Sequence, residues 1–179
     1  WRGRKPPVEY LNNFSDVIRW AAYVKIITPE QEIKMNRQST KNKDLSKKAL
    51  KSSIELRELL HRLFSDIEQR KKIKKQLLLK LNIFLQKAST GLTIKHPKIG
   101  FELAACVDPK NFMSLLYPII WESVNLLTSN DRLRIKSCGD KTCGWVFLDT
   151  SKNKSRQWCD MKSCGNRAKA RKFYKQKKG

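Results

Sequence analysis

The chain has 179 residues with 39 Lys or Arg against 16 Asp or Glu, so its formal net charge is +23. Hydrophobic residues make up 40% of it, which suits a globular domain with a small appended module. The longest apolar run, from about Phe112 to Leu127, is interrupted by polar residues and by Pro118, which excludes a membrane-spanning helix there. We therefore expect a soluble, cytoplasmic protein that has no membrane partner.

Two short helices are predicted near the N-terminus. Ser15 is a candidate N-cap for the first. In the second, Thr28 would be the N-cap, Pro29 the first helical residue and Gln31 the capping-box partner. Residues 35–43 are polar and lack apolar periodicity, which predicts a short second helix followed by a loop.

Two longer amphipathic helices are predicted next. From Asp44 onward, apolar residues recur mostly every three or four positions, which is typical of a core helix. This first stripe comprises Leu50, Ile54, Leu56, Leu59, Leu60, Leu63, Phe64 and Ile67. A second helix is predicted from near Gln69, and its stripe comprises Ile73, Leu77, Leu81, Phe84 and Ala88. Lysines cover its other faces, and a solvated surface is a commoner reason for them than a membrane or nucleic-acid site.

A small sheet and a further helix complete the first domain. Residues 92–95 and 100–107 read as two paired strands around a turn. Cys106 lies among apolar residues and is interpreted as a small buried hydrophobe rather than a ligand or nucleophile. Asp108 is a candidate N-cap for a helix to about residue 127, kinked at Pro118. These elements predict a helix-rich α+β domain over residues 1–130.

Four of the five cysteines lie in the remaining module, residues 131–179. Cys138, Cys143, Cys159 and Cys164 form two C-x4-C pairs separated by fifteen residues. Two disulfides or free thiols are alternatives, but a module of 49 residues has too little core to fold unaided, and this spacing favours metal in a reducing compartment. Four thiolates would close a tetrahedral site, so we predict one structural Zn²⁺.

The elements around the cysteines predict a treble-clef-like finger. Residues 145–148 are strand-like, 149–155 are rich in turn formers, and 156–158 could return as the antiparallel partner strand. A helix is predicted after Cys164, and Phe173 is expected to anchor it against Trp145 or Trp158.

Positive charge is concentrated in this module. Residues 132–179 hold 15 Lys or Arg against 3 Asp, a net charge of +12, which predicts a nucleic-acid partner. The candidate contacts, on the last helix and the returning strand, are Arg156, Arg167, Arg171, Lys172 and Lys175. Arg167 could equally donate to the thiolates, because it lies one turn from Cys164.

The module also resembles a known family. The sequence C-x4-C-G-W-V-F-L-D-T-S-K-N, followed by R-Q-W-C-D-M-K-S-C-G-N-R-A-K-A-R, resembles the CGNR zinc-finger family and contains its tetrapeptide, residues 164–167. The resemblance implies a bacterial transcription regulator whose finger follows an ABATE-type domain. It also implies a strand with a D-F-x-N-T-like sequence ahead of Trp1.

The predicted function is therefore DNA binding in transcription regulation, in association with the nucleoid. The finger would read DNA, and the first domain would control homodimerisation or respond to a small-molecule effector. An RNA- or ribosome-binding protein and a zinc-stabilised protein-interaction module are the alternatives. An enzyme is not expected, because His61 and His96 are the only histidines and neither lies in a recognisable catalytic arrangement.

Overall fold

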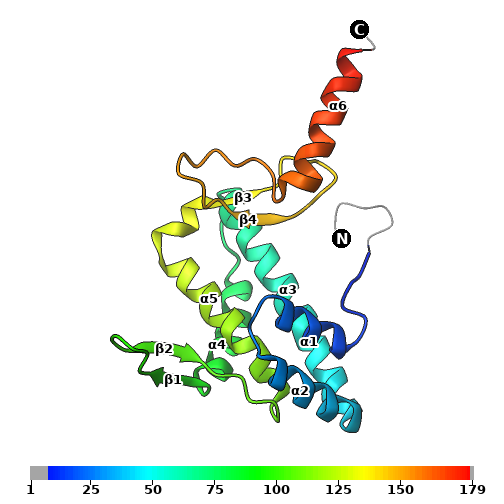
Figure 1. The fold of residues 1–179 in the computed structure, drawn as a ribbon. Coiled ribbons are helices and arrows are strands. Elements are labelled where there is room, and N and C mark those ends of the chain that lie inside the picture. The colour runs from blue at the N-terminus through cyan, green and yellow to red at the C-terminus, as the bar shows by residue number, and fades with distance from the viewer. Residues whose placement is uncertain (1–7, 178–179) are drawn as a thin grey trace. The chain divides into compact units, whose positions relative to one another are not determined.

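The structure, a computed structural model, describes residues 8–177; within this range the side chain of Lys175 is not described. The chain forms two compact units (Figure 1). The helical unit comprises residues 11–60 and 73–128, and the cysteine unit comprises residues 8–10, 61–72 and 129–177. The cysteine unit thus contains residues 61–72 in addition to the C-terminal module. The predicted domain boundary near residue 130 stays a prediction.

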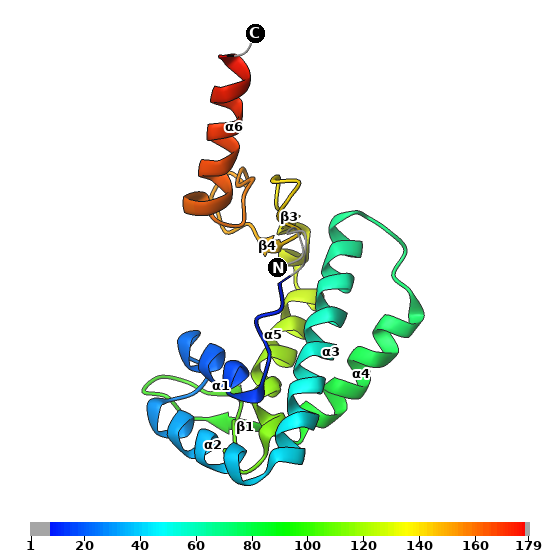
Figure 2. The ribbon, with the colours of Figure 1, turned by 90° about the vertical axis from the view of Figure 1, so that its right-hand side faces the viewer.

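Helices α1 (Phe14–Tyr23) and α2 (Pro29–Lys41) lie next to each other in the helical unit (Figure 2). The N-cap of α1 is Asn13, not the predicted Ser15, because Asn13 forms a reciprocal capping box with Asp16. The predicted cap of α2 is confirmed. Thr28 Oγ1 accepts from Gln31 N at 3.2 Å, and Gln31 Oε1 accepts from Thr28 N at 2.9 Å.

Helix α2 is longer than expected, and the loop predicted over residues 35–43 is wrong. The helix continues to Lys41 because Met35 and Ser39, one turn apart, face the interior and are buried. Ser39 Oγ donates to the backbone oxygen of Asn36 at 2.8 Å, so its hydroxyl is satisfied inside the protein. A contact made by one methionine and one small polar residue leaves no apolar periodicity in the sequence.

Helix α3 (Lys43–Glu68) is the predicted long core helix. All eight residues of its predicted apolar stripe are buried or half-buried. Helix α4 (Lys75–Ser89) begins later than the predicted start near Gln69, because Arg70 has a positive φ of 52° and Lys74 is extended. Both predicted strands are present as β1 (Leu92–Lys95) and β2 (Glu102–Ala105), which pair antiparallel.

The last helix of this unit differs from the prediction at its start. Asn111 caps a 3₁₀ helix, η1 (Phe112–Leu116), by accepting from Met113 N at 3.1 Å, and α5 (Tyr117–Thr128) follows. Pro118 is the second residue of α5, where the missing N–H has no intrahelical partner to lose, so it stands at the start of a helix and not inside one as predicted.

The core of the helical unit joins α1, α2, the N-terminal half of α3 and η1. Its buried residues are Phe14, Val17, Ile18, Ala21, Ile27, Met35, Ala49, Phe112 and Leu115. The rings of Phe14 and Phe112 lie 5.1 Å apart. Among the described residues, no helix has the length and apolar character needed to cross a bilayer.

In the cysteine unit, a 3₁₀ helix η2 (Asn130–Arg134) leads into β3 (Ile135–Ser137). Strand β3 pairs antiparallel with β4 (Val146–Leu148), with Ile135 opposite Leu148. The predicted return strand at residues 156–158 is wrong, because β4 takes β3 as its partner and 156–158 has no regular structure. A π-helical turn, η3 (Met161–Gly165), then continues into α6 (Asn166–Gln176).

Candidate metal centre

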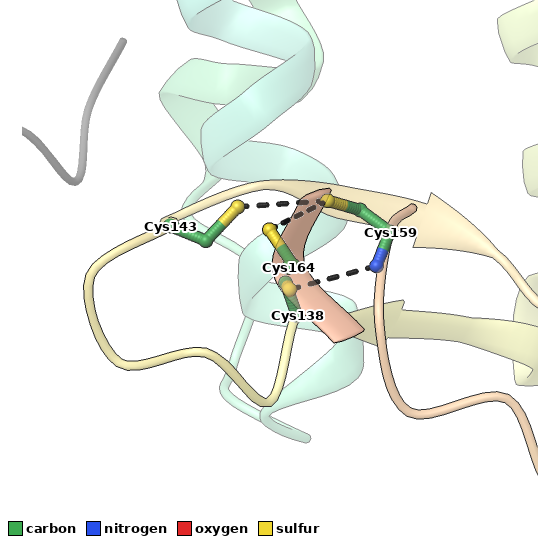
Figure 3. Close-up of side chains that lie close together, drawn as sticks. All are labelled: Cys138, Cys143, Cys159 and Cys164. Atoms are coloured by element: carbon green, nitrogen blue, oxygen red, sulfur yellow. Dashed lines mark hydrogen bonds between the residues drawn. The ribbon is translucent and has the colours of Figure 1, made fainter. Parts of the chain in front are cut away.

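The four predicted cysteines converge in one place (Figure 3). Their Sγ atoms all lie within 4.8 Å of one another, with 3.5 Å between Cys143 and Cys159 and 3.6 Å between Cys159 and Cys164. Tetrahedral zinc with Zn–S bonds of about 2.3 Å separates its sulfur ligands by about 3.8 Å. All four are free cysteines, so the alternative of two disulfides is wrong.

The chemistry of the four thiols also fits a cation. Cys143 and Cys164 are fully buried. Burial raises the pKa of Cys143 to about 11, and burial together with the neighbouring thiols raises the pKa of Cys159. Four thiolates this close repel one another unless a cation offsets their charge, and Zn²⁺ supplies that offset. Because four protein ligands fill a tetrahedral shell, the site is structural.

Asp140 shapes the loop that presents the first two cysteines. Its Oδ1 accepts from Thr142 N at 3.1 Å and from Thr142 Oγ1 at 2.9 Å. Its backbone oxygen accepts from Cys143 N at 2.8 Å, and Cys138 N donates to the oxygen of Trp145 at 2.8 Å. The loop leaves the site through Gly144, whose φ of +69° favours glycine.

Asp160 shapes the turn that presents the second cysteine pair, Cys159 and Cys164. Its carboxylate accepts from Ser163 N at 2.9 Å and from Ser163 Oγ at 2.6 Å, and it caps η3. These bonds lower the pKa of Asp160. The backbone oxygen of Asp160 accepts from Cys164 N at 3.0 Å. Cys164 is therefore carried on the helical turn that leads into α6, and the predicted helix after it is present.

Two arginines of α6 donate hydrogen bonds to Asp140, in the loop that carries Cys138 and Cys143. Arg167 Nε donates to Asp140 Oδ2 at 3.0 Å, and Arg171 Nη2 donates to Asp140 Oδ1 at 2.6 Å. Burial alone would raise the pKa of Asp140, but the hydrogen bonds from Arg171, Thr142 and Arg167 outweigh it and hold that pKa well below its ordinary value. Arg167 Nη2 also donates to Cys164 Sγ at 3.1 Å, so it braces the ligands.

The other predicted nucleic-acid contacts have different environments. Arg156 donates to the backbone oxygens of Trp158 and Cys159, and its guanidinium lies 4.7 Å from the centre of the Phe147 ring. Lys172 is exposed on α6. Lys175 lies in α6, but its side chain is outside the described part of the chain. The role of all five residues in nucleic-acid binding stays a prediction.

Phe173 does not anchor α6 as expected. It is 54% exposed, and its described ring contacts are with Tyr174, at 5.9 Å between centroids, and with the ammonium of Lys177. The predicted anchoring of the helix by an aromatic side chain is wrong, because the arginine pair on Asp140 holds α6 instead.

Asp149 is an organising residue that sequence reasoning missed. Its fully buried carboxylate accepts from Lys136 Nζ at 2.6 Å, from Ser151 N at 2.9 Å and from Arg156 N at 3.1 Å. Its pKa is lowered, first by the Lys136 bond and then by Ser151. These bonds close residues 149–156 into a loop. The sequence pattern that could have identified this residue is Asp-x-Ser at residues 149–151, which is typical of an Asx turn.

The C-terminal part of α3 belongs to the cysteine unit and contacts the residues around the cysteines. Nε2 of His61 lies 2.9 Å from the oxygen of Gly144, and Ser137 Oγ donates to Glu68 Oε2 at 2.9 Å. Each of these residues belongs to the cysteine unit. The partners lie 83 and 69 positions apart, and no local pattern signals either contact.

Comparison with protein families matches residues 134–177 to the CGNR zinc finger. Comparison with curated proteins gave no match. The family match confirms the resemblance of the C-terminal module and coincides with the four-cysteine cluster. The ABATE-type assignment concerns residues outside this match and stays an expectation.

Proposed function

We propose that the C-terminal module, residues 131–179, binds nucleic acid through α6. Its proposed target is duplex DNA, and its proposed role is transcription regulation. The observation that carries this proposal is the way the module uses its acidic residues. Of its four aspartates, Asp140, Asp149 and Asp160 accept hydrogen bonds inside the module, and Asp131 pairs with Arg134. The uncompensated charge at the surface is therefore positive.

Helix α6 concentrates that charge. Residues 166–176 contain no acid, and Lys169 and Lys172 are exposed. From residue 169 to 177, every described side chain is exposed, so this part of the helix buries no apolar face within the described structure. A short helix without such packing is marginal in water and gains stability from a partner. A polyanion is the complementary partner, because each phosphate contact releases counterions.

The test compares two variants with equal charge changes. In the α6 variant, Lys169, Lys172 and Lys177 become Gln; in the control, Lys47, Lys48 and Lys51 of α3, which are also exposed, become Gln. Arg171 is left intact because it holds Asp140. Duplex affinity is measured for the zinc-loaded full chain across a salt series.

The α6 variant should bind more weakly and lose about 0.9 unit of salt slope for each phosphate contact removed. The control should keep the slope of the wild-type protein. Equal losses in both variants would show binding by net charge alone. Unchanged binding in the folded α6 variant would remove α6 from the interface and favour the protein-docking alternative.

Structured RNA is the second candidate, and the exposed aromatic side chains of α6 favour it. Phe173 is 54% exposed and Tyr174 67% exposed, beside Lys172 and Lys177. Aromatic rings on a basic surface stack on unpaired bases, which duplex DNA does not present. Competition between a DNA duplex and an RNA hairpin with an unpaired loop, at fixed salt, separates the two. Preference for the hairpin that is lost in F173A/Y174A would assign RNA.

A further inference from the structure

The guanidinium of Arg171 lies between a buried acceptor and solvent. Its Nη2 donates to Asp140 Oδ1 at 2.6 Å, while the side chain remains 49% exposed. Among the described residues, the hydrogen bond of the Arg171 side chain goes to the carboxylate of Asp140. A guanidinium has five N–H donors in a planar fork, so most of its donors remain available to a ligand. The anion whose geometry suits such a fork is a phosphate or a carboxylate.

Arg167, one turn earlier, has a different arrangement. Its Nε and Nη2 are directed at the Asp140 carboxylate and at Cys164 Sγ. Its donors serve the metal ligands and the carboxylate. Of the two arginines on Asp140, Arg171 is therefore the one whose fork can take an external anion.

Asp140 is itself held firmly. Its side chain is fully buried, and Thr142 donates to it through both backbone and hydroxyl. It also lies between two metal ligands, Cys138 and Cys143, so the site that binds zinc fixes its position. A free arginine side chain loses rotamer freedom when it binds a ligand, and Asp140 has already removed part of that freedom from Arg171.

We propose that Arg171 is a phosphate-binding fork and that Asp140 is its positioning residue. The ligand is a backbone phosphodiester of the nucleic acid, so this inference rests on the proposed function of α6. Zinc binding then has a second role, because it places Asp140 and thereby sets the direction in which Arg171 is presented.

A double-mutant cycle on the zinc-loaded full chain tests the inference. D140N removes the charge but keeps an oxygen for Thr142 N, and R171Q removes the fork. K172Q on the neighbouring exposed lysine is the matched control. Zinc content and far-ultraviolet circular dichroism are checked for each variant. Affinity for one DNA duplex and one RNA hairpin is then measured from about 0.05 to 0.2 M salt.

R171Q should bind about eightfold more weakly at 0.1 M salt and lose about 0.9 unit of slope, the share of one phosphate contact. D140N should weaken binding severalfold, and the double variant D140N/R171Q should bind no more weakly than R171Q. The effects of D140N and K172Q should instead multiply, because Lys172 has no described contact with Asp140.

Several outcomes would overturn this assignment. If R171Q binds with the affinity of the wild-type protein and K172Q binds more weakly, Arg171 is not a phosphate-binding residue, although α6 is still the interface. Multiplying effects of D140N and R171Q would refute the positioning role. Absence of zinc-dependent affinity in the wild-type protein would instead refute the proposed function itself.

A second comparison remains decisive if D140N fails to bind zinc. R171K keeps the charge but has no planar fork, so it should keep more of the salt slope than R171Q and still bind severalfold more weakly than the wild-type protein. K172R should bind like the wild-type protein. Equal affinity of R171K and the wild-type protein would show that charge alone matters at this position.

Discussion

Replacing Asp149 by Asn should destabilise the C-terminal module and weaken its binding of zinc. Oδ1 of Asp149 accepts from Ser151, and Oδ2 accepts from Lys136 Nζ and Arg156 N. An Asn side chain keeps one oxygen for Ser151, but its NH₂ group then faces two other donors. The side chain of Asp149 is 0% exposed, so water cannot replace the lost acceptor.

The magnitude follows from the bonds lost. The Lys136 bond involves two charged groups and contributes about 2 kcal/mol, at the lower end of its range because Lys136 is 33% exposed. The bond from Arg156 N contributes about 1 kcal/mol. The total loss is about 3 kcal/mol. Because folding and zinc binding of such a module are linked, the apparent zinc dissociation constant should rise roughly 150-fold.

The assay is competition for zinc against a chromogenic chelator at pH 7, with the full chain. D131N is the matched control, because Asp131 is 56% exposed and its bond to Arg134 is 3.4 Å long. The control should change the free energy of unfolding by less than about 1 kcal/mol. Zinc affinity of D149N within threefold of the wild-type value would refute the reasoning.

Three further predictions follow from the same structure. Chelating the zinc should unfold the C-terminal module and leave α1 and α2 intact; protection of their amides from hydrogen exchange checks this, and loss of protection there would contradict it. Zinc uptake at pH 7 should release protons from at least Cys143 and Cys159, because burial raises the pKa of Cys143 to about 11 and that of Cys159 also rises. Affinity should therefore increase with pH, and calorimetry in buffers of different ionisation enthalpy that found no release would show preformed thiolates. Met35→Ala should lower the stability of the helical unit by about 2 to 5 kcal/mol, whereas I33A, a matched change at a 69% exposed residue, should have little effect; thermal melts that show equal losses would contradict the burial of Met35.

The sequence alone determined the features that depend on near neighbours. The spacing of four cysteines identified the zinc ligands because each pair is presented by one short loop. The cap of α2 followed from Thr28 and Gln31, three residues apart. The apolar stripe of α3 was visible because helical periodicity repeats within the element itself.

Tertiary structure alone decided the features that depend on distant partners. Arg171 reads as a free basic residue until Asp140, 31 positions away, is brought against it. Strand β4 could have paired with residues after it, but it pairs with β3 because Asp149 folds the following residues into a loop of their own. Met35 lies in a polar stretch, and only packing against other elements shows that it is buried. In each case the deciding contact joins residues that no local pattern relates, and its geometry exists only once the chain has folded.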